Sequence, residues 1–137
     1  MPLDLEIVSP ERLLLSRPVD MVVIPAEEGD LGALPNHAPM IVLLRGGLVR
    51  LFEGGQVIDR LFVTGGFAEI TGSRVTVLAD EAMAPNAVSR EEGERRLAAA
   101  QADYDRTDKA DVPALDAAMA RMQSARAMIE TAQTAGA

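Results

Sequence analysis

Residues 21–49, MVVIPAEEGDLGALPNHAPMIVLLRGGLV, decide the fold of this chain. The stretch begins as an apolar run, changes character at Pro25, and returns after Pro39 as a second apolar run that ends at two glycines. Two β-rich runs separated by prolines, glycines and acidic residues predict two strands joined by a shaped loop. The loop contains His37, the only histidine of the chain. Because binding residues often lie on loops held by a rigid scaffold, we look for function here first.

Further runs with strand character lie on both sides of this stretch. Residues 3–8 read LDLEIV and alternate apolar with acidic side chains, which is the period of a half-buried strand. Pro18 separates two more runs, which we expect to form a tight hairpin. Because no helical pattern intervenes, short strands at this spacing predict an antiparallel β-sandwich or flattened barrel in residues 1–84. The other expected strands cover residues 12–17, 19–24, 48–52, 57–63, 67–71 and 74–78.

Residues 85–137 have helical rather than strand character after a loop over residues 82–87. Ser89 followed by Glu92 forms a capping box, which predicts a helix over residues 90–105. A second helix is expected to begin near Pro113, because proline is favoured in the first helical turn. Two helices joined by a short charged turn predict an antiparallel α-helical hairpin.

The apolar seam of the predicted hairpin consists mostly of Ala and Met. Burial of a methylene contributes about 0.8 kcal/mol, so an Ala-lined seam stabilises much less than a Leu-lined seam of equal length. We therefore expect the hairpin to be marginally stable. Two interpretations remain open: a small cap on the sandwich, or an element that detaches and binds elsewhere.

Composition excludes several classes of protein. The chain has 137 residues, 48% of them hydrophobic, so we expect a folded protein rather than a disordered one. It contains no cysteine, which excludes disulfides, thiol nucleophiles and Cys-ligated zinc. The net charge of −8 argues against nucleic-acid binding, which needs clustered Lys and Arg. The N-terminal residues predict neither a signal peptide nor a transit peptide, and no run approaches the roughly 20 apolar residues that cross a bilayer.

The residues give little support to catalysis. His37 without any cysteine leaves no recognisable triad, and neither a phosphate-binding loop nor a dinucleotide fingerprint is present. Glu27, Glu28 and Asp30 could hold a cation, but they lack the oxygen-ligand spacing of a calcium loop. We expect no catalytic residue, metal or cofactor, and thus a binding module with a projecting loop. Two alternatives stay open: a small hydrolase or isomerase that uses His37 with a carboxylate, and a stand-alone nucleotide-binding β-sandwich.

Two segments carry a resemblance to a known family. They are IPAEEGDLGALPNHAPMIVLLRGGLVR, residues 24–50, and FVTGGFAEITGSRVTVLADEA, residues 62–82. Together with their spacing, the EGDLG, NHAP, VTGGF and VTVLAD motifs are similar to the epsilon subunit of the F-type proton-translocating ATP synthase, which is called delta in mitochondria. The resemblance implies a flattened antiparallel β-sandwich of about ten strands followed by an α-helical hairpin, which agrees with the fold expected above.

The resemblance also implies a role and partners. In that family the sandwich is a non-catalytic part of the rotating central stalk, held against the gamma subunit and in contact with the membrane-embedded c-ring. By motif position, Glu28, Asp30 and Leu31 are expected to contact the c-ring. The residues expected to face gamma are His37, Ala38, Pro39 and Met40. The implied location is the cytoplasmic face of the bacterial inner membrane, with membrane contact only through the complex.

The tail of some family members binds ATP through a short motif, but the sequence of this chain departs from that motif. An aliphatic residue and Asp, followed after two positions by Arg-Ala, would stand where this chain has Val88, Ser89 and Glu92-Gly93. A carboxylate in place of a guanidinium repels a polyphosphate, so we expect no ATP binding by the tail.

The hairpin is also implied to regulate ATP hydrolysis weakly, through transient contact with the alpha and beta subunits. The residues expected to meet an acidic segment of beta in an extended tail are Arg95, Arg96, Arg121 and Arg126.

Overall fold

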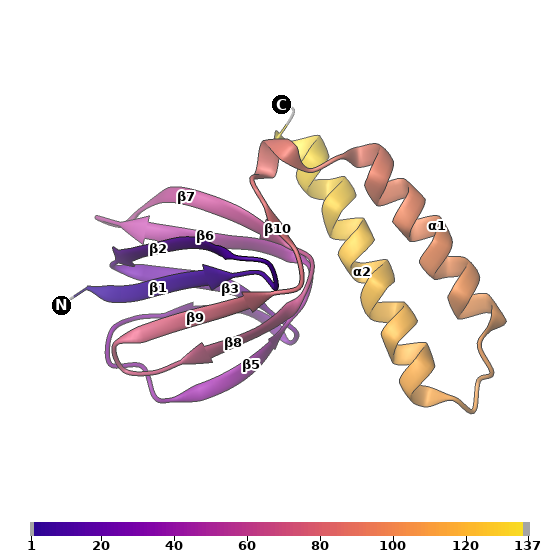
Figure 1. The fold of residues 1–137 in the computed structure, drawn as a ribbon, viewed down its shortest axis with the longest axis horizontal. Coiled ribbons are helices and arrows are strands. Elements are labelled where there is room, and N and C mark those ends of the chain that lie inside the picture. Colours follow the sequence, from indigo (N-terminus) through magenta and orange to yellow (C-terminus); the bar gives the residue numbers. More distant parts are fainter. Residues whose placement is uncertain (1, 136–137) are drawn as a thin grey trace.

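A computed structural model describes residues 2–135 as a β-sandwich followed by two helices, as Figure 1 shows. The predicted fold class is confirmed. The two predicted domains, 1–84 and 85–137, extend beyond the described residues at both ends of the chain. The strands are β1 (Leu3–Val8), β2 (Leu13–Val19), β3 (Met21–Ala26), β4 (Gly29–Ala33), β5 (Met40–Leu44), β6 (Gly47–Glu53), β7 (Gln56–Val63), β8 (Gly66–Ile70), β9 (Arg74–Ala79) and β10 (Ala82–Met83).

The strands form one ten-stranded sheet that folds over on itself in the order β10-β7-β6-β3-β5-β8-β9-β1-β2, with β4 beside β3. Neighbouring strands are antiparallel, as predicted, except β1 and β9, which run parallel. The core between the layers is aliphatic. On β1, Leu3, Leu5 and Ile7 are fully buried, as the alternating pattern predicts.

The hairpin predicted on either side of Pro18 is wrong. The structure pairs β2 with β1, and Pro18 lies inside β2 opposite Asp4. Because β2 is the last strand of the sheet, a residue without an N–H donor is tolerated there. The chain then turns at Asp20 and enters β3, which pairs with β4, β5 and β6 instead.

The loop predicted between the two apolar runs contains a strand of its own. Pro25 continues β3 opposite Asp30, and its carbonyl accepts a hydrogen bond from the amide of Arg45 at 2.9 Å. Glu27 and Glu28 form a two-residue turn into β4. At this turn Gly29 has a φ of +139°, which favours glycine. The true loop is therefore shorter than predicted and follows Ala33.

The segment before the helices is also more regular than the loop predicted there. Residues 82–83 pair with β7 as β10, and the short 3₁₀ helix η1 (Pro85–Ala87) follows. Helix α1 (Arg90–Arg106) then begins after Ser89, whose Oγ accepts a hydrogen bond from the Glu92 amide at 3.1 Å. The predicted cap is thus confirmed. Helix α2 (Val112–Ala135) runs back beside α1 and completes the hairpin.

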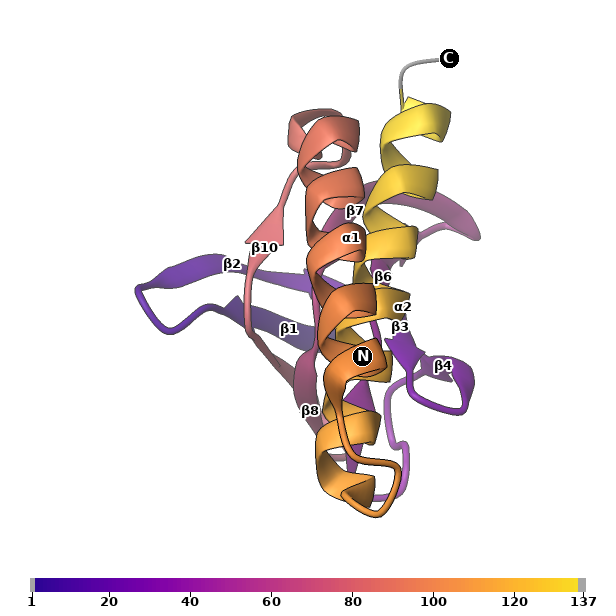
Figure 2. The same ribbon diagram turned by 90° about the vertical axis from the view of Figure 1, so that its right-hand side faces the viewer.

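Glycines allow α2 to lie close to two neighbours. A Cβ at Gly93 in α1 would stand 2.9 Å from Cγ1 of Ile129, and a Cβ at Gly46 in the β5–β6 turn would stand 2.7 Å from Cα of Ser124. Helix α2 therefore packs between α1 and the end of the sandwich, as Figure 2 shows from the side of the hairpin. Phe62, Val88 and Met128 form a second small apolar cluster where α2 meets the sheet.

Candidate interaction surfaces

The outward side of β5 and β8 carries large apolar side chains. Ile41, Leu43 and Phe67 are 69%, 61% and 42% exposed. Leu43 lies opposite Phe67, which lies opposite Leu78 of β9, which in turn lies opposite Val8 of β1. Residues in register share a face of the sheet, and Ile41 lies on the same side of β5 as Leu43, opposite Glu69. These five apolar residues are here called the outer apolar face. Apolar patches exposed in this way mark sites of protein association.

The acidic turn between β3 and β4 lies at the end of the sandwich that faces the hairpin. Glu27 lines the same cleft as Gly46 and Asp80. The Asp30 carboxylate is not free, because Nη2 of Arg50 lies 3.0 Å from Oδ2 and Nη2 of Arg45 lies 3.6 Å from Oδ1. Of the other two residues expected at the c-ring, Glu28 is exposed and Leu31 is half-buried. A partner at this turn would therefore meet a mixed acidic and basic surface.

The His37 loop lies at the opposite end of the sandwich. The amide of Asn36 donates to the carbonyl of Gly72 at 2.6 Å, which fastens the loop to the β8–β9 turn. Asn36 has a φ of +69°, an uncommon value for a residue other than glycine. His37 Nδ1 lies 2.7 Å from the carbonyl oxygen of Ala38, the next residue in the chain. Beyond it, Pro39 and Met40 are exposed and lead into β5.

The two sets of expected contacts are therefore far apart. The Glu27–Glu28 turn and the His37 loop are separated by the length of β4, five residues or about 17 Å. They cannot form a single edge, and any partners would bind at different ends of the sandwich. The outer apolar face runs along the sandwich between these ends, because β5 leads from the loop towards the hairpin.

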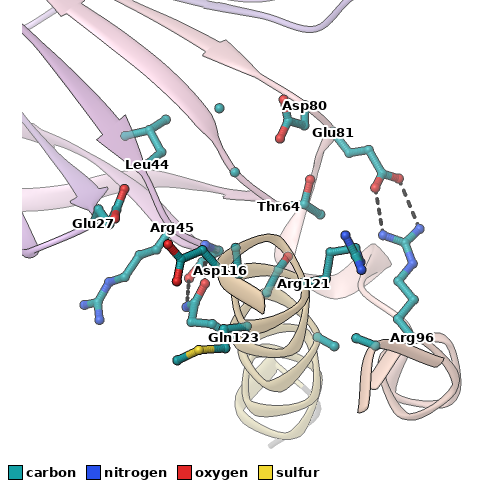
Figure 3. A pocket seen from close by; sticks show the side chains of 18 of the residues that line it. Glu27, Leu44, Arg45, Thr64, Asp80, Glu81, Arg96, Asp116, Arg121 and Gln123 are labelled. Atoms are coloured by element: carbon teal, nitrogen blue, oxygen red, sulfur yellow. Dashed lines mark hydrogen bonds and ion pairs between the residues drawn. The ribbon is translucent and has the colours of Figure 1, made fainter. Parts of the chain in front are cut away.

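The arginines expected at the beta subunit are mostly paired within the chain. Arg95 binds Glu92 at 2.6 Å, and Arg121 lies 3.5 Å from Asp103. Arg96 reaches across to the sandwich and binds Glu81 through two hydrogen bonds of 2.7 and 3.1 Å, drawn in Figure 3. The hydrogen bond to Glu81 raises the pKa of Arg96 above its ordinary value, against the opposing effect of partial burial. The fourth, Arg126, is exposed on α2.

A cleft of about 900 Å³ separates part of the hairpin from the sandwich. Figure 3 shows it between α2, α1 and the turns at the ends of β5, β7 and β9. Its charged lining comprises Glu27, Arg45, Asp80, Glu81, Arg96, Asp103, Asp116 and Arg121. Five of these side chains are acidic and three are basic, so the lining as a whole disfavours a polyanion.

The residues at the altered ATP motif have structural roles. Ser89 caps α1, Glu92 binds Arg95, and Gly93 lies against α2, where a side chain would collide with Ile129. Within residues 2–135, no group of three or more His, Cys, Asp or Glu side chains is arranged to hold a metal ion. No helix in the same range is long and apolar enough to cross a membrane.

Comparison with known proteins decides the family. The model of the ATP synthase delta/epsilon chain β-sandwich domain matches residues 2–85. The chain belongs to the ATP synthase epsilon chain family. It is similar to the ATP synthase epsilon chain of Granulibacter bethesdensis, at 64% identity over 94% of this chain and 96% of the relative. It is also similar to that of Gluconacetobacter diazotrophicus, at 56% identity over 96% of this chain and 94% of the relative.

Solved structures agree on the fold. One chain of the Euglena gracilis mitochondrial ATP synthase OSCP/F1/c-ring structure matches with a TM-score of 0.69 at 22% identity, covering 99% of this chain and 82% of that one. A chain of the Tetrahymena thermophila mitochondrial ATP synthase central stalk/c-ring structure matches with a TM-score of 0.62 at 12% identity, covering 96% and 97%. The resemblance to the epsilon subunit that the EGDLG and NHAP motifs indicate is confirmed.

Sequence reasoning missed the outer apolar face and the Arg96–Glu81 pair. The run from Met40 to Leu44 is apolar throughout, which suggests a strand buried on both sides. Alternation within FAEIT over residues 67–71 was the available signal, because it places Phe67 on the side opposite the buried Ala68 and Ile70.

Proposed function

We propose that the chain is a non-catalytic central-stalk subunit of the F-type ATP synthase, which links the gamma subunit to the c-ring and so couples proton translocation to ATP synthesis. The observation that carries this function is the outer apolar face. Leu43 and Phe67 expose surface that a monomer would normally bury, and a face built on a packed sheet is suited to a permanent partner. The gamma subunit is the partner assigned to this face.

The two ends of the sandwich extend the proposal. A subunit that bridges two partners needs separate contact sites on one rigid body, and the β3–β4 turn and the His37 loop meet that requirement. The turn with Glu28, Asp30 and Leu31 is assigned to the c-ring. The loop from His37 to Met40 is assigned to gamma, because it leads directly into β5 and the outer apolar face.

The subunit would be peripheral, on the cytoplasmic face of the bacterial inner membrane, and would reach the membrane only through the complex. Its role is mechanical: it transmits torque and contributes no catalytic residue. We also assign it no bound nucleotide, because Glu92 replaces the motif arginine and is already paired with Arg95. Calorimetry with Mg-ATP tests this assignment. Saturable binding at submillimolar ATP would contradict it and would favour the alternative, a nucleotide-binding sandwich.

Co-purification with a tagged gamma subunit tests the main proposal. Leu43→Glu places a charge in the outer apolar face and should abolish the complex, because an unpaired carboxylate would be buried at the interface. The matched control is Val57→Glu on β7, where the valine is 42% exposed, as Phe67 is, but lies outside that face. The control should bind gamma as the wild type does. Equal binding by both variants, or no binding by the wild type, would overturn the proposal.

Regulation through the hairpin is the finer part of the proposal. Transient contact of the arginine-bearing helices with the alpha and beta subunits would inhibit ATP hydrolysis weakly, because most of these arginines must first leave partners in their own chain. Simultaneous replacement of the four arginines by Gln should remove any inhibition by the tail while gamma binding remains. Unchanged inhibition would contradict the proposed contact with the beta subunit, but it would not contradict the central-stalk function.

A further inference from the structure

The hairpin touches the sandwich in two unlike ways. Near the C-terminal end of α2, Phe62, Val88 and Met128 form a closed apolar contact. Towards the tip of the hairpin the cleft of about 900 Å³ opens between α2 and the sandwich, and Met119 on α2 is left 53% exposed. The apolar contact therefore covers only one end of the interface. The hydrogen bonds and ion pairs described next join the hairpin to the sandwich over the rest of the interface.

Two polar pairs cross this interface. Gln123 of α2 accepts a hydrogen bond from the Gly46 amide and donates one to the Gly46 carbonyl, both at 2.8 Å. Arg96 of α1 donates two hydrogen bonds to the Glu81 carboxylate. Each helix is thus tied to a different turn of the sandwich, α2 to the β5–β6 turn and α1 to the segment between β9 and β10. Figure 3 draws both pairs on either side of the cleft.

The position of Gly46 makes the α2 pair specific. The backbone of Ser124 lies so close that any Cβ at position 46 would collide with it. The amide and the carbonyl of Gly46 therefore face Gln123 only while α2 is fully seated. Movement of α2 by about one hydrogen-bond length would leave two buried backbone groups without partners, which is costly. The two hydrogen bonds between Gln123 and Gly46 are therefore expected to form or break together.

The α1 pair places the guanidinium group of Arg96 between two carboxylates of its own chain. Nη1 and Nη2 bind the two oxygens of Glu81, and Nε faces Oε2 of Glu92 at 3.8 Å. In the docked hairpin Arg96 is thus committed to Glu81 across the interface. Release of the hairpin exposes the guanidinium and also leaves the Glu81 carboxylate free.

We propose that Arg96–Glu81 and Gln123–Gly46 together form a latch that sets the fraction of molecules with a docked hairpin. The latch is a property of the isolated chain and is tested on it alone.

The rate of thiol labelling measures how often the hairpin opens. Val88 lies in the docking cluster, and the chain has no cysteine, so Val88→Cys introduces a single thiol that is covered while the hairpin is docked. With an uncharged thiol reagent that reacts more slowly than the hairpin closes, the labelling rate is proportional to the open fraction. All variants are compared in this full-length background.

Glu81→Gln and Gln123→Ala should each raise the labelling rate. For the exposed Arg96–Glu81 pair the increase should be about two- to five-fold, the usual range for such a pair, and added salt should raise the rate of the background chain more than that of Glu81→Gln. The matched control is Glu53→Gln, since the Glu53–Arg17 pair has similar exposure but lies within the sandwich. The control should label at the background rate. Unchanged rates in both latch variants, or an equal rise in the control, would overturn the latch.

A charge exchange separates the latch from simple damage to the helix. Glu81→Arg should raise the labelling rate further by repelling Arg96, and adding Arg96→Glu to it should bring the rate back towards the background. Far-UV circular dichroism monitors α1, because a carboxylate at position 96 would lie near Glu92. A double variant that labels as fast as Glu81→Arg alone, with α1 intact, would contradict direct pairing across the interface. Loss of gamma binding by the wild type would contradict the proposed function but not this result.

Discussion

The sandwich and the hairpin differ in what holds them together. The sandwich core consists mostly of Leu, Ile and Val side chains that are almost completely buried between two layers. The hairpin instead buries mostly small groups, Gly93 and Ala100 from α1 and Ala118 and Ala125 from α2, with Met122 and Met128 as its large buried apolar side chains. Close backbone approach allows the helices to pack, but each small residue removes little apolar surface from water.

The difference indicates two mechanical roles in one chain. A sandwich whose core is continuous is suited to carry load between partners at its two ends. A hairpin that is held by one small apolar cluster and two polar pairs can change position without disturbing that core. The predicted marginal hairpin is therefore compatible with its packing, and the four changes below test the contrast from the largest expected effect to the smallest.

Truncation in the sandwich core should have the largest effect. Leu51→Ala removes a fully buried side chain between the layers and should lower the free energy of unfolding by about 2–5 kcal/mol. Met119→Ala in α2, where the side chain is half exposed, should change it by less than about 0.5 kcal/mol. Urea denaturation followed by far-UV circular dichroism measures both. Equal losses would remove the contrast between the regions.

Filling the helix–helix contact should loosen the hairpin alone. Gly93→Ala creates contacts of 2.9 Å with Ile129 and 3.1 Å with Met128, and such overpacking costs about 1–3 kcal/mol. Alanine is otherwise the better helix former by about 1 kcal/mol, so a stabilised hairpin would show that the contact is not tight. The fluorescence of Tyr104, the only tyrosine, reports on α1 during urea denaturation. Ala98→Gly, at an exposed site of α1, measures the propensity effect by itself.

Removing the cap should fray α1. Ser89→Ala deletes the acceptor for the Glu92 amide and should destabilise the hairpin by about 1 kcal/mol. Ser89→Asp keeps an acceptor at the start of the helix and should retain wild-type stability. Hydrogen exchange of the first-turn amides of α1 distinguishes the two variants. Identical exchange in Ser89→Ala and the wild type would show that the cap does not stabilise α1.

The acidic turn should contribute least to stability. Asp30→Asn weakens exposed ion pairs with Arg45 and Arg50, and should cost less than about 1 kcal/mol in urea denaturation. A larger loss would mean that the turn belongs to the rigid sandwich rather than to its contact surface. Arg50→Gln is the complementary change and should have an effect of the same size.

Much of the fold could be predicted because strand and helix signals are local. The alternation of LDLEIV places Leu3, Leu5 and Ile7 in the core, and Ser89 with Glu92 marks the start of α1. Strand β4 was missed because GDLGA has two glycines and one aspartate in five residues, which hides its period. A proline after MVVI predicts a break at Pro25, yet Pro25 continues β3, since its carbonyl still accepts a hydrogen bond from the Arg45 amide.

The candidate site was less predictable because it depends on pairing between distant segments. Leu43 becomes exposed only when β5 pairs with β8 in a register that turns Ala68 inward. Arg96 and Glu81 meet only after the chain has turned from β9 through β10 into α1. The residues expected from motif position include neither Leu43 nor a pairing of Arg96 with Glu81. The assignments of Asp30 and His37 to particular partners stay predictions.

Hydroxyl-radical footprinting of the assembled complex tests the central claim most directly. Burial of the outer apolar face against gamma predicts that oxidation of Leu43 and Phe67 falls strongly on assembly. Val57 and Ile58, which are also exposed in the free chain but lie on β7, should keep their rates. Unchanged oxidation of Leu43 and Phe67 in the complex would contradict the account.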